Sequence, residues 1–180
     1  MRTTAAAICF ALFVPALTLP AVAESLTEKT GVNSLIGVSP STQDFVTEAA
    51  VSDMFEIQSS RLALQKAGDQ GTKDFAQTMI ADHGKTSAEL EALVASGATK
   101  ANLPTALDSP HQSMLDKLKS LNGGDFTKQY HDDQAQGHED AVDLFKRYAK
   151  GGKDQKLKDW ARKTLPTLQH HLQMAQALDK

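Results

Sequence analysis

FAQTMIADHGKTSAELEALV, residues 75–94, is the stretch that decides the fold of this chain. Its apolar residues recur every three or four positions, so on a helical wheel they share one face, opposite Lys85 and Glu89. That face consists of Phe75, Ala76, Met79, Ile80, Leu90, Leu93 and Val94. His83 lies in the middle of it. The stretch therefore predicts an amphipathic helix that directs one imidazole toward the protein interior.

The same period recurs along most of the chain beyond residue 38. Glycines interrupt it at Gly68, Gly97 and the pair Gly151-Gly152, and such glycines commonly follow the last turn of a helix. Between these interruptions the sequence predicts long helices over residues 42–67, 72–96, 125–150 and 153–178. No segment alternates with the period of two that a strand requires.

The links between these helices predict how the helices pack. The links at 69–71 and 151–152 are short, so each joins an antiparallel pair. Residues 97–124 form a long connector, in which a shorter amphipathic helix is predicted over 111–121. These features indicate an all-α, ferritin-like four-helix bundle with one crossover and a short extra helix in its long connection. A simple up-down bundle with an ordered middle loop is the alternative.

The N-terminus predicts export from the cytoplasm. Arg2 precedes a short apolar run, and Ala21-Val22-Ala23 matches the small-x-small pattern of a signal peptidase site. We therefore expect a signal peptide over 1–23, cleaved after Ala23, a flexible leader over 24–38 and the bundle domain over 39–180. A periplasmic or secreted location follows from this prediction.

Composition narrows the choice of partners. The formal net charge is −3, and acidic and basic residues are interspersed, so no basic patch indicates nucleic-acid binding. No segment of the mature chain is predicted to span a membrane. The single cysteine, Cys9, lies in the predicted signal peptide, which leaves the mature chain without disulfides or thiolate ligands. A protein partner and the oligomeric state cannot be predicted from the sequence.

Three histidines point toward chemistry. His83, His138 and His171 each lie within the apolar stripe of a different predicted helix, and Glu56 lies at a comparable height in the first. Midpoints of packed helices coincide whichever way each helix runs, so the four side chains are expected to meet. His171 fits least well, because it lies about 8 Å past the middle of its helix at 1.5 Å per residue.

Such a cluster has two interpretations. Three imidazoles and a carboxylate suit one transition-metal ion, Zn, Cu, Ni or Fe, and Asp82 and Gln134 are placed to accept or orient ring N–H groups. Alternatively, each histidine is a hydrogen-bonded core residue without a ligand, which is the commoner role of a single buried histidine. We find no motif for a catalytic triad or a phosphate loop.

The chain resembles a bacterial family of exported ferritin-like proteins. The resemblance rests on Met79-Ile80-x-Asp82-His83, on Phe126-x-x-x-Tyr130 followed by His138, and on Leu165-Pro166-x-Leu168-x-x-His171-Leu172. It also includes Phe45-Val46-x-x-Ala49 and Glu56. The family is catalogued as domain of unknown function four-one-four-two and is often labelled a predicted outer-membrane protein. The resemblance implies a ferritin-like bundle in an exported protein and no established activity.

The sequence departs from the pattern of ferritin di-iron sites. Those sites use Glu-x-x-His on two helices. Here the residues three positions before His83, His138 and His171 are Ile80, Ala135 and Leu168. We therefore do not predict ferroxidase or oxygen-activating di-iron chemistry.

These observations favour a non-catalytic binding protein or envelope-stress accessory protein, with the core cluster as a candidate mononuclear metal site. Two alternatives remain open at this level. One is a metalloenzyme or metal-storage protein that uses the same residues. The other is a purely structural interaction module with buried, neutral histidines.

Overall fold

The computed structural model describes residue 34 and residues 37–178. The predicted signal peptide and most of the predicted leader lie outside the described residues. The helices are α3 (Thr42–Lys66), α4 (Gln70–Ala95), α5 (Ser109–Ser120), α6 (Gly123–Gly151) and α7 (Gln155–Ala175). This confirms the all-α prediction, including the extra helix in the long connector.

Side-chain caps determine where most of these helices begin. Ser41, Asp69, Asp108 and Asp154 each accept a hydrogen bond from a backbone N–H of the first turn, which satisfies a donor that has no partner within the helix. The start of α6 differs from the prediction. The sequence predicts its start at residue 125, but the helix begins two residues earlier, at Gly123, and Asp125 lies in its first turn. A carboxylate there still interacts favourably with the positive end of the helix dipole.

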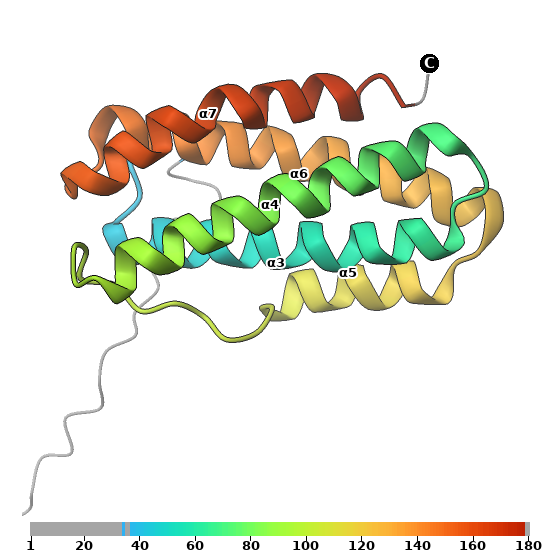
Figure 1. Ribbon diagram of the computed structural model, residues 1–180, viewed down its shortest axis with the longest axis horizontal. Helices are drawn as coiled ribbons and strands as arrows, with labels where there is room; N and C mark the ends of the chain where they lie inside the picture. The colour runs from blue at the N-terminus through green and yellow to red at the C-terminus, as the bar shows by residue number, and fades with distance from the viewer. Residues whose placement is uncertain (1–33, 35–36, 179–180) are drawn as a thin grey trace, which may run out of the picture.

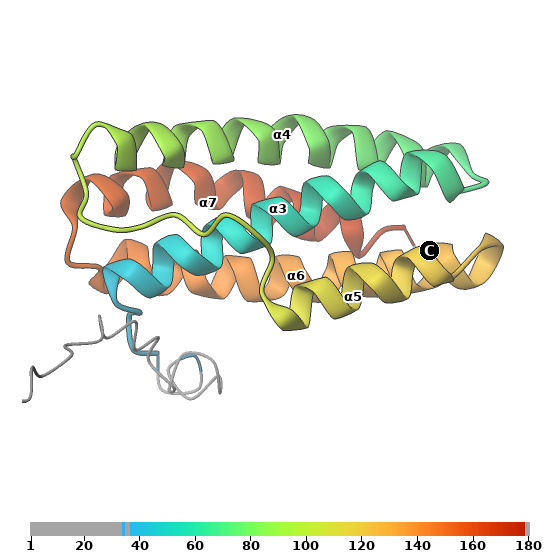
Figure 2. The same ribbon diagram turned by 90° about the horizontal axis from the view of Figure 1, so that it is seen from below.

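The direction of the helices identifies the topology. α3 and α4 run antiparallel, the connector with α5 returns along the bundle, and α6 then runs in the same direction as α4 (Figures 1 and 2). α7 runs back antiparallel to α6. α3 packs on α4 and α6 packs on α7, while α5 lies mainly against α3. This is the one-crossover, ferritin-like arrangement, and the simple up-down alternative is wrong.

A polar layer separates the apolar core into two clusters. One cluster contains Phe45, Phe145 and Trp160, and the other contains Phe75 and Tyr130. Along α3, α4, α6 and α7, buried polar side chains lie between the residues of the two clusters. The buried polar side chains of this layer are Asp53, Glu56, His83, Gln134, His138 and His171. Among the described residues, no helix is long and apolar enough to cross a membrane.

Candidate metal centre

The three histidines meet in the polar layer. The ring centroids of His83, His138 and His171 lie 5.4–5.5 Å from one another, and one nitrogen from each ring lies within 4.8 Å of the others. Each residue is only 1–2% exposed. All three rings therefore lie within ~5 Å of a common centre, as shared coordination at ~2 Å requires.

An axial shift of α7 brings His171 to this level. Figure 1 shows α7 displaced toward the end of the bundle where α3 begins, so that its C-terminal part lies beside the middle of α4 and α6. His171 lies four residues before Ala175, the last residue of α7. The displacement of the helix thus compensates for the late position of the histidine in it.

Each ring is oriented by a hydrogen bond on its outer side. Nδ1 of His83 lies 2.7 Å from Asp53 Oδ1, and Nε2 of His171 lies 2.8 Å from Asp82 Oδ2. Nδ1 of His138 lies 2.8 Å from the backbone oxygen of Gln134, which only accepts hydrogen bonds. In the neutral rings these nitrogens carry the protons. The lone pairs of His83 Nε2, His138 Nε2 and His171 Nδ1 are then left for a ligand.

These remaining nitrogens need a cation or a shared proton. His83 Nε2 and His138 Nε2 lie 3.4 Å apart, and two unprotonated acceptors at that separation repel each other. Two nitrogens bound at ~2.0–2.1 Å in tetrahedral geometry are about 3.4 Å apart, which matches this distance. Nδ1 of His171 is buried and has no hydrogen-bond partner in the described part of the chain. The donor set therefore fits a transition-metal ion.

The surroundings keep two of the three rings neutral. Burial, with the charge of His83, lowers the pKa of His138 to about 3. Burial also lowers the pKa of His171, although the hydrogen bond to Asp82 acts in the opposite direction. Burial opposes a charge on His83 as well, but Asp53, Glu56 and Asp82 together raise its pKa. Of the three rings, His83 is therefore the one that most readily carries a proton, which a metal ion would displace on binding.

Glu56 lies beside the histidines and is not a member of the three-nitrogen group. It is 1% exposed, and its Oε2 atom has no hydrogen-bond partner among the described residues. Burial raises the pKa of Glu56 to about 7, while the charge of His83 and a hydrogen bond from Gln134 act in the opposite direction. A Cβ atom on Gly137 would lie 3.3 Å from Glu56 Oε1, so this glycine leaves room for the carboxylate.

Both residues predicted to support the histidines do so, but only Gln134 supports the histidine nearest to it in the sequence. Asp82 binds His171 on another helix, not its neighbour His83. Gln134 supports His138 with its backbone oxygen, one turn away.

Asp53, the partner of His83, was missed by the sequence analysis. Its Oδ2 atom also accepts from Thr86 Oγ1 at 2.9 Å and from Ser87 Oγ at 3.2 Å. A signal for it exists along α3 and its C-cap residue, where residues spaced alternately by three and four are all buried: Val46, Ala49, Asp53, Glu56, Ser60, Ala63 and Ala67. This spacing marks one face of a helix.

The profile of the family described as domain of unknown function DUF4142 matches residues 27–178. The chain belongs to this family. The match confirms the resemblance seen in the sequence. No curated protein sequence matches the DUF4142 chain.

Two solved structures share the fold of this DUF4142 protein. One is described as "CopM in the Cu(II)-bound form", with a TM-score of 0.64 and 18% identity, covering 79% of this chain and 98% of that one. The other is a putative secreted DUF305 protein from Streptomyces coelicolor, with a TM-score of 0.60 and 14% identity, covering 75% of this chain and 90% of that one. At these identities the similarity establishes the helical bundle alone.

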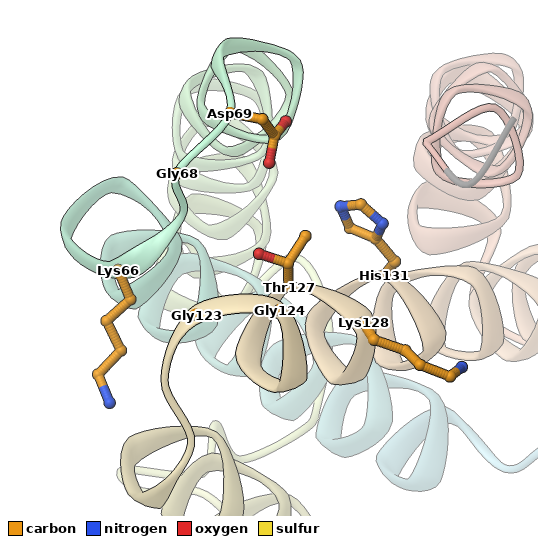
Figure 3. A pocket seen from close by; sticks show the side chains of 8 residues that line it. All are labelled: Lys66, Gly68, Asp69, Gly123, Gly124, Thr127, Lys128 and His131. Atoms are coloured by element: carbon orange, nitrogen blue, oxygen red, sulfur yellow. The ribbon is translucent and has the colours of Figure 1, made fainter.

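A separate hollow of about 670 Å³ lies at the turn between α3 and α4 of the DUF4142 chain (Figure 3). The side chains of its two lysines, Lys66 and Lys128, point in different directions and do not converge. Lys66 Nζ donates to the oxygen of Leu121 at 2.7 Å, and Lys128 pairs with Asp132 at 2.8 Å. His131 Nε2 is bonded to a threonine hydroxyl. Because these polar groups already have partners, the histidine cluster remains the candidate site.

Proposed function

We propose that this chain is an exported, non-catalytic protein that binds one transition-metal ion, foremost copper, through His83, His138 and His171. The observation that carries the proposal is the convergence of three buried ring nitrogens whose outer nitrogens are all hydrogen-bonded. Outer partners of this kind fix the tautomer and orientation of metal-binding histidines. A histidine that serves packing alone does not need two further imidazoles beside it whose outer nitrogens are also hydrogen-bonded.

The chemistry of the donors supports copper among the transition metals. Neutral imidazoles bind Zn, Cu, Ni and Fe, and for a given nitrogen site the affinity of divalent ions peaks at Cu²⁺. A protein with the same fold was solved in a Cu(II)-bound form. The signal peptide predicted over 1–23 supports export, and another protein of similar fold is described as secreted.

Burial supports a binding role in preference to catalysis. The three histidines are 1–2% exposed and Glu56 is 1% exposed. A catalytic metal keeps an open coordination position that a substrate can reach. An ion enclosed in this layer is expected to be retained and not to turn over substrate.

Metal analysis tests the proposal. Protein purified from the periplasm without an affinity tag is expected to take up about one copper ion per chain, and the His83→Ala variant is expected to lose it. His170→Ala is the matched control, because His170 is the exposed neighbour of His171 on α7. A wild-type protein that takes up neither copper nor zinc would overturn the proposal.

Asp53→Asn is expected to weaken copper binding by roughly 10–100-fold, because a neutral amide is a poorer acceptor for the His83 N–H. The measurement is a titration against a competing chelator. Asp74→Asn is the control, because Asp74 is an exposed residue on α4 whose carboxylate accepts a hydrogen bond from Gln70. Equal affinities of the two variants would show that Asp53 does not support the site.

A further inference from the structure

A groove lies against the polar layer on the side of the bundle covered by α5. It has a volume of about 760 Å³ and is lined by α3, α6, α5 and the residues just before α5. Figure 2 shows α5 running beside α3 and α6, with the connector approaching it. The α5 residues that face the groove include His111 and Met114, which lie one helical turn apart. The groove therefore reaches from the surface toward the centre of the bundle.

The lining of this groove is strongly acidic. It contains the carboxylates Glu48, Glu56, Asp108, Asp140 and Asp143. Arg147 also lines it, but its guanidinium bonds Asp143 at 2.7 Å and the oxygen of Val38 at 2.8 Å. An excess of carboxylates in a concave, partly desolvated site concentrates the field and attracts cations.

Glu56 connects the groove to the histidines. It lines the groove, is 1% exposed, and has an Oε2 atom without a hydrogen-bond partner in the described ranges. A Cβ atom on Gly137 would lie 3.3 Å from Glu56 Oε1, so the carboxylate lies against the part of α6 that carries His138. Gly137, directly before His138 in the sequence, lines the same place without a side chain. A buried carboxylate between an acidic groove and three imidazoles is suited to pass a cation from one to the other.

We propose that this groove is the path by which a metal ion reaches the histidine cluster, and that Glu56 is the last carboxylate on that path. The inference rests on the proposed function, because it requires that the cluster binds metal. The ion is drawn in by the acidic lining, is held briefly by Glu56, and exchanges oxygen for imidazole ligands. The ion keeps its oxidation state and changes only its ligands, and a proton held at His83 is released to solvent as the ion binds.

Stopped-flow loading of Cu²⁺ into the metal-free protein tests the path. Asp140→Asn and Glu56→Gln are each expected to slow loading roughly tenfold at low salt, because they remove charge from the groove. The slowing by Asp140→Asn is expected to shrink as salt screens the remaining charges. Asp159→Asn removes an exposed carboxylate on α7, away from the groove, and is expected to load at the wild-type rate.

A steric block gives a second, independent test. Cys9 is the only cysteine of the sequence and lies in the predicted signal peptide, so one introduced cysteine can be labelled selectively. A bulky maleimide on the Met114→Cys variant is expected to slow copper loading and copper release by the same factor, at least tenfold, because both use one path. The same label on Ser113→Cys, an exposed neighbour that does not line the groove, is expected to change neither rate.

The outcomes separate the two proposals. A wild-type protein that binds no metal overturns the proposed function. If the wild-type protein binds copper, but the labelled Met114→Cys protein and the Asp140→Asn protein both load copper at the wild-type rate, the path is overturned and the proposed function stands.

Discussion

Saturating copper is expected to raise the thermal unfolding midpoint of the metal-free protein by roughly 8–16 °C. A ligand at 1,000 times its Kd that binds only the folded state stabilises that state by about 4 kcal/mol. For a domain of about this size, each kcal/mol shifts the midpoint by roughly 2–4 °C. Calorimetry of the metal-free protein with and without copper measures the shift.

Variants identify the source of this stabilisation. His138→Ala removes the ring whose Nε2 atom lies 3.4 Å from that of His83, and copper is expected not to shift its midpoint. His170→Ala is expected to keep the full shift. If copper stabilised wild-type and His138→Ala protein equally, the binding site would have to lie elsewhere.

Glu56→Gln is expected to stabilise the metal-free protein by about 3 kcal/mol at pH 8 and to have little effect near pH 4.5. Burial raises the pKa of Glu56 to about 7 from an ordinary value of 4.5, and each pH unit of such a shift corresponds to about 1.4 kcal/mol. Because the folded state binds the proton more tightly, the contribution of Glu56 to stability is lost as pH rises from 4.5 through 7. Glutamine avoids that loss, since it never carries the charge.

Urea denaturation in the presence of a chelator, at pH 5 and pH 8, measures this difference. Glu91→Gln is the control, because Glu91 is an exposed glutamate on α4, where a surface substitution is expected to change stability by less than about 0.5 kcal/mol. A Glu56→Gln variant with the same advantage at both pH values would contradict the assignment of a buried, titrating carboxylate.

The helices and their order could be predicted because the necessary information is local. The apolar period of each helix, together with the glycines at the ends of α3, α4 and α6, indicates where the helices lie. The length of residues 97–124 predicted the crossover, since only a long connector can return along the bundle. The predicted start of α6 is two residues late, because an aspartate such as Asp125 is favourable both as a helix cap and inside the first turn.

The candidate site was predictable in part. A histidine within an apolar stripe predicts its own burial, and α4, α6 and α7 have clear stripes. The hydrogen bonds between helices depend on their axial positions, which no local pattern contains. Asp82 therefore pairs with His171 and not with its neighbour, and Asp53 was missed because α3 is covered on more than one side.

The crossover would give a metal ion bound at the histidine cluster a mechanical role. His83 belongs to the α3–α4 hairpin, whereas His138 and His171 both belong to the α6–α7 hairpin. His138 lies 55 residues after His83 in the chain. An ion bound by all three would close a loop of that length, and closing a long loop restricts the unfolded chain. In a mature chain predicted to lack cysteine, the ion would serve as a reversible crosslink. Its removal would loosen the contact between the hairpins before it affected either hairpin alone.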